Sequence, residues 1–432
     1  MHKWFCSIEL LSVALLLQKP YHLNTSFFIA KRLALGKQKS FSRFIIRLSI
    51  GATSVGVAAM IVTLCFVNGF QETVAQKVYS FWGHIRVQQY EPEKSMMAEE
   101  LPIVKNDTVS RIIQKTKNIS TVQPFATKSA VIEKNKNIEG ILFKGIENGY
   151  DSSQLKSYLV SGRWLQFSDS LYSKEIMLSL QLCNLLEIQL NDTIQLYFIN
   201  NEDGTRTYRK LKVVGIYKTG IEEYDKLFAV GDLRLIRRVN DWQNNQIGGY
   251  EIFCNNYNQA DSINEQLSNA LPSEWMSRTI QSIYPNIFDW LKIQDVNRNV
   301  IFIIMSVIAI INLITCLLIL ILERTNMIGL LKSLGATNNN IIRIFLYYAT
   351  VIAAVGISIG FLLGAGICML QQYSGFIALD ESAYYVATAP VKIIWWQLAA
   401  VCICTLAICY LVLIIPALLV KKISPINAIE FR

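Results

Sequence analysis

The sequence has few of the residues that metalloenzymes and hydrolases use. Three histidines occur among 432 residues, and none has a second metal ligand at a useful spacing. The GxxxxGK[ST] phosphate loop and the HExxH zinc pair are both absent. We therefore expect no catalytic residue, no metal site and no cofactor bound by this chain. His84 is interpreted as a structural hydrogen-bonding residue, and Asp225, Asp380 and Glu381 as loop contacts on the outward side.

Charge is missing from four long segments, Leu48–Val67, Val300–Leu322, Ile344–Leu370 and Ile393–Val420. Each is long enough, at about 1.5 Å per residue, to cross the roughly 30 Å hydrocarbon core of a bilayer. The whole chain is 52% hydrophobic and 17% charged, with a mean hydropathy of +0.32. These values predict a polytopic α-helical membrane protein with four spans. Because the spans contain no ionisable side chain, an ion-coupled transporter with a midplane site is disfavoured.

Basic residues gather on one side of the predicted spans. They are concentrated in residues 25–47, 323–343 and 421–432, whereas the short loop 371–392 is nearly free of them. The positive-inside bias then places both termini in the cytoplasm and residues 68–299 outside. The net charge of +9 thus reflects membrane topology, and we expect no nucleic-acid partner.

The first 47 residues divide into two parts. Residues 1–24 form an N-terminal extension to which we assign no function, since its apolar stretch is too short to span and contains Glu9. Residues 25–47 alternate apolar and basic side chains, which is typical of an amphipathic helix on an anionic cytoplasmic leaflet. Binding of a partner by this helix is the alternative.

The insert 68–299 is large enough for one large or two small domains. Runs rich in β-formers predict strands at 84–89, 127–133, 139–144, 193–199, 211–216, 227–230 and 250–254, with a hairpin turn at 201–205. Helical patterns occur at 109–117, 175–186 and 260–270, and 282–299 is expected to lead as a helix into the second span. This mixture predicts an α+β domain. Cys183 and Cys254 in the insert either form a disulfide or remain separate buried thiols.

The segment 323–343, between spans two and three, has the pattern of a short displayed helix. Met327, Ile328, Leu331 and Leu334 recur at helical spacing, and we predict that this apolar face has nothing to pack on within its own chain. Gly335 is placed for a left-handed cap, and either Thr337 or Asn338 can cap the next helix. A cytoplasmic helix of this kind indicates a soluble partner. The predicted contact residues are Glu323, Arg324, Met327, Ile328, Leu331, Lys332, Leu334, Gly335, Ala336 and Thr337.

Small residues mark predicted helix–helix contacts in spans one and three. Gly51 and Gly56 let another helix approach span one closely. Gly356, Gly360 and Gly364 form a stripe at four-residue spacing in span three. Because glycine costs about 1 kcal/mol within an exposed helix, three on one face indicate tight helix packing.

Four stretches resemble the LolC/LolE family of lipoprotein-releasing ABC transporter permeases, within the MacB-like (FtsX-superfamily) permeases. They are GVAAMIVTLCFVNGFQETVAQKV followed by FWGHIRV, ERTNMIGLLKSLGATNNNIIRIFL, DESAYYVATAPV, and PALLVKKISPINAIEFR. The resemblance covers residues 26–432. It implies a multi-pass inner-membrane protein with a periplasmic 68–299 domain. A MacB-like exporter of peptides or small molecules and a cargo-free FtsX-like regulator are the alternative functions.

The resemblance also implies the partners. Two permease subunits, either two copies or this chain and a paralogue, would sit on two LolD-like ATPase subunits that bind ATP and Mg. Residues 323–337 would then insert into a groove of the ATPase and transmit its closure. Acyl chains of a lipoprotein would pass laterally from the membrane between spans one and two toward a periplasmic carrier. The residues expected to line that path are Met60, Leu64, Phe66, Val307 and Ile311.

Overall fold

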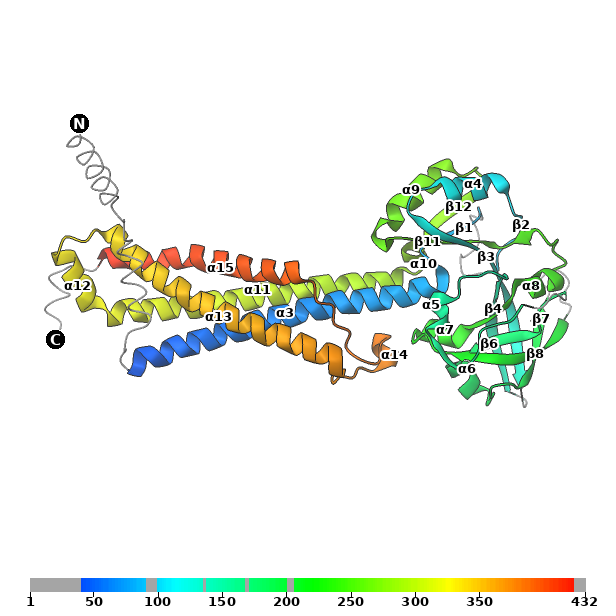
Figure 1. Cartoon of the computed structure of the whole chain (residues 1–432), viewed down its shortest axis with the longest axis horizontal. Helices are drawn as coiled ribbons and strands as arrows, with labels where there is room; N and C mark the ends of the chain where they lie inside the picture. Colours follow the sequence, from blue (N-terminus) through cyan, green and yellow to red (C-terminus); the bar gives the residue numbers. More distant parts are fainter. Residues whose placement is uncertain (1–39, 91–98, 135–136, 168–170, 200–205, 423–432) are drawn as a thin grey trace, which may run out of the picture. The chain divides into compact units, whose positions relative to one another are not determined.

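The structure is a computed structural model that describes residues 40–90, 99–134, 137–167, 171–199 and 206–422 (Figure 1). Its internal contacts divide the chain into two compact units. The helical unit holds the described residues up to Val67, Val296–Ser374 and those from Val391 onward. The α+β unit holds Asn68–Asp295 and Gly375–Pro390. The chain therefore passes between the two units four times.

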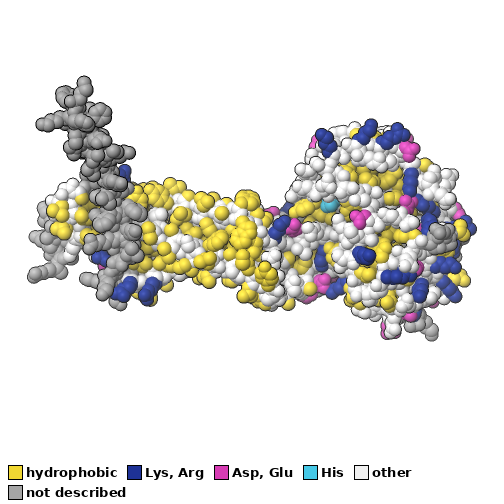
Figure 2. All heavy atoms as spheres, in the orientation of Figure 1, with side chains coloured by type: hydrophobic (Ala, Val, Ile, Leu, Met, Phe, Trp, Pro, Cys, Tyr) yellow, Lys and Arg dark blue, Asp and Glu magenta, His cyan; other side chains and the backbone are white. Residues whose placement is uncertain are grey.

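Four helices among the described residues are long and apolar enough to cross a membrane. They are α3 (Ser40–Trp82), α11 (Pro285–Glu323), α13 (Asn338–Ser374) and α15 (Trp395–Ala417), and α12 (Thr325–Ser333) and η2 (Leu418–Lys422) accompany them. Hydrophobic side chains cover the visible face of these helices, whereas charged side chains are spread over the α+β unit (Figure 2). Four apolar helices together with an α+β domain confirm the coarse prediction of the fold.

Helix α3 is longer than the predicted span at both ends. It begins at Ser40, so residues 40–47 are its first turns and do not form a separate surface helix as predicted. Residues 1–39 of the predicted extension and amphipathic helix lie outside the described residues. At its other end α3 continues to Trp82 and stops at Gly83, whose φ of +71° is a conformation that glycine adopts without strain.

The α+β unit is built on a ten-stranded sheet in the order β12-β1-β11-β3-β4-β9-β6-β8-β5, with β7 paired to β3 and β8. The pairs β4–β9 and β6–β8 are parallel, and the other pairs are antiparallel. The strands of this sheet are β1 (Ile85–Gln89), β3 (Ile119–Lys134), β4 (Asn137–Ile146), β5 (Leu159–Gly162), β6 (Glu175–Ser179), β7 (Thr193–Ile199), β8 (Arg206–Tyr217), β9 (Phe228–Asp232), β11 (Gly249–Cys254) and β12 (Trp275–Thr279). A separate two-stranded sheet pairs β2 (Ile103–Val104) with β10 (Gln246–Ile247).

Short helices pack on the sheet and fill its connections. They are α4 (Asp107–Lys115), α5 (Ser153–Lys156), α6 (Leu180–Leu185), α7 (Glu222–Leu227), α8 (Leu233–Val239), η1 (Tyr257–Gln259), α9 (Ala260–Ala270) and α10 (Ile280–Ile283). A further short helix, α14 (Glu381–Tyr384), lies in the chain between α13 and α15. One continuous core contains side chains from the sheet and from α4, α6, α8 and α9. Each of the seven predicted strands overlaps an observed strand, and the predicted 201–205 turn lies outside the described residues.

Two helix predictions in this unit are wrong in part. Residues 175–179 form strand β6, and helix α6 starts only after Ser179, whose hydroxyl accepts the Leu182 amide at 3.0 Å. The strand is buried on both faces, and a short apolar run of that kind has no periodicity that distinguishes it from a helix. The helix expected from residue 282 begins at Pro285, because proline has no amide hydrogen and suits the first helical position.

The carboxyl end of α3 is held inside the α+β unit by a buried ion pair. Lys144 on β4 is fully buried, and its Nζ lies 2.7 Å from Oε1 of Glu251 on β11. The same ammonium donates to the carbonyl oxygen of Phe81 and lies 4.4 Å from the centre of the Trp82 ring. A cation at a helix carboxyl end is favoured by the helix dipole, so this contact fixes the last turn of α3.

Candidate functional site

The predicted partner-binding segment is helix α12, which follows α11 after the single residue Arg324. It closes with a double hydrogen-bond cap: the amide of Ala336 donates to Leu331 O at 2.9 Å, and that of Gly335 to Lys332 O at 3.0 Å. This pattern requires a left-handed residue after the helix, and Gly335 supplies it with φ of +89°. Thr337 then accepts the Asn340 amide through its hydroxyl at 3.4 Å, at the start of α13.

The apolar face predicted for α12 packs largely on its own chain. Ile328 is fully buried in a cluster formed by α11, α13 and α15, and Met327 and Leu331 pack against that cluster. The Nζ of Lys332 donates to Val420 O at 2.9 Å, which ties α12 to η2. The prediction that this face has nothing to pack on within the chain is therefore wrong. Three of its four residues anchor the helix to the bundle.

The exposed apolar residues of α12 are Leu330 and Leu334, with 57% and 75% of their surface accessible. They lie on one side of the helix, on the face opposite Ile328. Sequence reasoning missed Leu330, because two adjacent leucines in GLLKSLG do not reveal which of them points outward. The remaining predicted contact residues, Glu323, Arg324, Ala336 and Thr337, are half-buried or exposed around the two ends of the helix.

The glycine stripe of α13 lies directly against α3. A Cβ atom at Gly360 would stand 2.6 Å from Ser54 O, and one at Gly364 would stand 3.0 Å from Ile61 Cβ. At Gly356 the nearest atom would be Thr53 Cβ at 2.9 Å. The Ser54 hydroxyl adds a hydrogen bond across the contact to Gly356 O at 2.9 Å. The two helices therefore touch backbone to backbone.

The small residues of span one behave differently from that stripe. An added Cβ at Gly56 would lie 3.9 Å from Met305 O on α11, an ordinary contact, and one at Gly51 would meet no atom within 4 Å. The expectation that Gly51 marks a close helix contact is wrong within this chain.

Residues 356–360 of α13 have the sequence GISIG, which fits the GxSxG pattern of serine hydrolases. Helix α13 is continuous there, so Ser358 is not on the strand-to-helix turn that a serine nucleophile needs.

The five residues expected to line a path for acyl chains are only partly brought together. Met60 on α3 and Val307 on α11 line one apolar groove of about 480 Å³, together with Phe302, Ile303 and residues of α15. Leu64 is buried between helices, with 7% of its surface accessible. Ile311 is exposed on α11, and Phe66 is half-buried on α3.

The titratable groups singled out in the insert are structural. The Nδ1 of His84 accepts the Cys254 amide at 2.9 Å, and burial lowers the pKa of His84 to about 4. Asp225 is buried on α7, where its carboxylate accepts the amides of Thr219 and Gly220 at 3.0 and 2.9 Å, so it is no surface loop contact. Cys183 and Cys254 are separate buried thiols, which decides between the two alternatives.

Comparison with known families matches both parts of the chain. The MacB-like periplasmic core domain matches residues 48–268, and the FtsX-like permease C-terminal region matches residues 299–425. The first of these covers more than half of the chain. The chain belongs to the MacB-like permeases. The match of the FtsX-like region to residues 299–425 includes α12 and the glycine stripe of α13.

Two curated relatives match this MacB-like permease over most of its length. It is 22% identical to the lipoprotein-releasing system transmembrane protein LolE of Haemophilus influenzae, over 94% of this chain and 100% of that protein. It is 20% identical to the lipoprotein-releasing system transmembrane protein LolC of Neisseria meningitidis serogroup B, over 92% and 96%. The periplasmic region of MacB from Actinobacillus actinomycetemcomitans matches with 14% identity, 47% and 91% coverage and a TM-score of 0.33. The resemblance to LolC and LolE is confirmed.

Proposed function

We propose that this chain is the permease subunit of an ATP-driven transporter that releases lipoproteins from the inner membrane toward the outer membrane. The observation that carries the proposal is the match to lipoprotein-releasing relatives through both the helical unit and the α+β unit. The subunit itself is non-catalytic, and ATP is hydrolysed by a separate LolD-like subunit. Release of small molecules or peptides and regulation without cargo are not favoured by the relatives found.

Helix α12 is the proposed contact with the ATPase. Its Ile328 face fixes it to the bundle, which leaves Leu330 and Leu334 to enter an apolar groove of the partner. Because α12 is anchored through the core of α11, α13 and α15, a push on its exposed face is passed to those helices. A second permease, either another copy or a paralogue, would complete the complex.

The proposed orientation follows from charge. The basic residues of 323–343 accompany α12, so the positive-inside bias puts α12 and both termini in the cytoplasm and the α+β unit in the periplasm. The groove beside Met60 and Val307 would accept an acyl chain from the lipid, because almost all of its lining is apolar. The released lipoprotein would pass to a periplasmic carrier.

The experiment that tests the function is depletion of the protein followed by fractionation of the two membranes. Outer-membrane lipoproteins should accumulate in the inner membrane, and normal sorting would refute lipoprotein release. If lipoproteins sort normally while the cells become sensitive to a toxin, a MacB-like exporter of peptides or small molecules becomes the better-supported function.

The proposed coupling contact has its own test. Leu330→Asp should abolish co-purification of the ATPase, because it places a charge in an apolar groove. Val160→Asp is the matched control, since Val160 has a similar accessible fraction, 55%, but lies on β5 of the α+β unit. Leu331→Asp is less informative, because it also disrupts packing of α12 on the bundle. Undiminished ATPase binding by Leu330→Asp combined with Leu334→Asp would exclude this face.

A further inference from the structure

The loop that joins α13 to α15 has a defined structure of its own. Ala378 and Thr388 form an antiparallel bridge, and the amides of Leu379 and Ala389 donate across it at 2.9 and 3.0 Å. Within it lies α14, which is followed by Tyr385 at a positive φ of +59°. Residues 375–390 belong by their contacts to the α+β unit, although both helices they connect belong to the helical unit.

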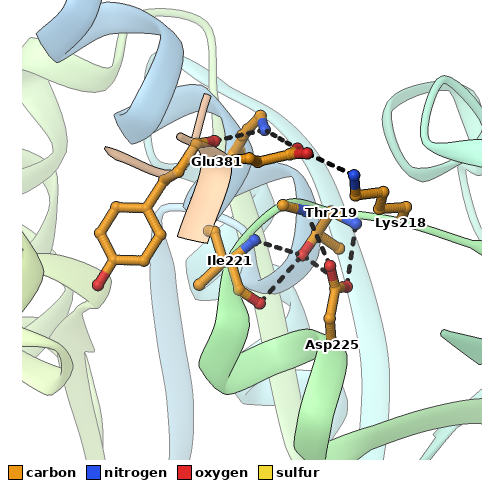
Figure 3. A network of polar contacts seen from close by, with 8 residues as sticks. Lys218, Thr219, Ile221, Asp225 and Glu381 are labelled. Atoms are coloured by element: carbon orange, nitrogen blue, oxygen red, sulfur yellow. Dashed lines mark hydrogen bonds and ion pairs between the residues drawn. The ribbon is translucent and has the colours of Figure 1, made fainter. Parts of the chain in front are cut away.

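Glu381 fastens this loop to the α+β unit through two lysines. Its carboxylate pairs with Lys218, which follows strand β8 (Figure 3). The carboxylate also lies 3.7 Å from the Nζ of Lys77, near the end of α3. The same Lys77 ammonium donates to Tyr385 O at 2.6 Å. The side chains of Lys77 and Glu381 are 14% and 24% exposed, so solvent screens their interaction less than that of a surface pair. We call these three residues the Glu381 bracket.

The backbone next to Lys218 is shaped to receive Glu381. Gly220 has φ of +75°, and a Cβ there would collide with the Glu381 carboxylate and lie 2.5 Å from Lys77 Nζ. The buried carboxylate of Asp225 holds this turn by accepting the Thr219 and Gly220 amides, as Figure 3 shows. The turn that receives Glu381 is therefore held by hydrogen bonds to Asp225 that do not involve the loop.

Aromatic contacts hold the loop on its other side. The ring of Tyr385 packs edge-on against that of Trp290 at the start of α11, with the ring centres 5.6 Å apart. Its hydroxyl donates to Glu223 on α7 at 3.3 Å. Burial, with the nearby carboxylates, raises the pKa of Tyr385 to about 12, so this hydroxyl keeps its proton at neutral pH.

We infer that Glu381 is a positioning residue that makes the 375–390 loop a direct mechanical link from α13 and α15 to the α+β unit. Through this link, movement of α13 and α15 reaches the turn after β8 at Lys218, in addition to what α3 and α11 transmit through their own continuous helices. The source of that movement, an ATPase acting on α12, rests on the proposed function. The bracket itself does not, since it is built from the contacts of this chain.

The test compares Glu381→Gln with Glu222→Gln in the full chain, reconstituted with its ATPase in nanodiscs. Glu222 is a half-buried carboxylate of the same region that pairs with Lys226 on its own helix, so its replacement controls for the loss of a nearby negative charge. Amide hydrogen exchange of residues 375–390 should become at least roughly threefold faster in Glu381→Gln. The reason is that the loop no longer has to break the ion pairs of Glu381 in order to open locally. Gly220→Ala should have the same effect by displacing the carboxylate.

The second readout is the change in exchange of residues 218–232 when the ATPase is trapped with ATP and vanadate. We expect wild type and Glu222→Gln to show this change and Glu381→Gln to lose most of it, with ATPase activity held within about twofold. Unaltered loop exchange in both Glu381→Gln and Gly220→Ala would overturn the bracket, and an undiminished vanadate response would overturn its coupling role. Failure of the wild type to bind an ATPase would instead count against the proposed function. The hydrogen exchange of residues 375–390 in the variants would still show whether Glu381 holds the loop.

Discussion

The strongest single-residue effect on stability is expected at Lys144, which joins the sheet to the last turn of α3. Lys144→Met keeps much of the side-chain volume but leaves Glu251 as a buried carboxylate without its cation. Removing one partner of a buried ion pair costs about 3–5 kcal/mol. The change also removes the donor to Phe81 O, and an unpaired buried carbonyl costs about 1–3 kcal/mol. These terms overlap, so we expect a total loss of roughly 4 kcal/mol.

Urea unfolding of the full chain in detergent, followed by pulse proteolysis, measures this loss. With a denaturant slope of about 2–3 kcal/mol/M, the midpoint should fall by roughly 1–2 M. Lys144→Met combined with Glu251→Gln should recover part of the loss, because no buried charge then remains. Lys226→Met, which breaks an exposed pair on α7, should change the stability by less than about 1 kcal/mol. The reasoning would fail if Lys144→Met shifted the midpoint no more than Lys226→Met.

Three further predictions concern pH, helix packing and thiol chemistry. The pKa of His84, about 4 in the folded protein, lies below its ordinary value, so the unfolded state binds the proton more readily. Stability should therefore fall by up to about 3 kcal/mol as pH drops from 6.5 to 4, and His84→Gln should remove that part of the pH dependence in urea titrations. Gly360→Val should destabilise the α3–α13 contact by about 1–3 kcal/mol in thermal unfolding, whereas Gly366→Val, with open space around it, should not. Burial raises the pKa of Cys183 to about 12 and of Cys254 to about 11, so peptide mass spectrometry should find both unlabelled by maleimide at neutral pH until urea is added.

The sequence was most informative where one local pattern decides the structure. The charge-free segments predicted the membrane helices, and the positive φ of Gly335 follows from its place after an apolar turn. It was least informative where the partner of a residue lies far along the chain. The composition of Glu175–Ser179 fits either a helix or a buried strand. The segment is a strand because it pairs with β8 on one side and β9 on the other. In α12, helical spacing located an apolar face but did not show that this face packs on the chain's own bundle.

The Glu381 bracket joins residues 163 positions apart, and no local signal pairs Lys218 with a loop between two membrane spans. The sequence predicts Glu381 as a loop contact on the outward side, but it does not name the partners of that contact. What distinguishes it is Gly220, whose left-handed backbone clears space for the carboxylate. The glycine of YKTGIEEYDK indicates a tight turn, but the sequence does not show which side chain occupies the space beside that glycine.

The contact between α3 and α13 restricts which parts of the membrane region can rearrange. Where side chains interlock, two helices have several alternative packings and can change from one to another. At Gly356 and Gly360 the neighbouring atoms belong largely to the backbone and Cβ positions of α3, so few side-chain rotamers can change at this contact. Sliding along such a surface would also lose the contact of the Ser54 hydroxyl with Gly356 O, although that hydroxyl can still donate to Ile50 O on its own helix. We therefore expect α3 and α13 to move together, so that conformational change in the membrane occurs at the surfaces that this pair presents to its neighbours.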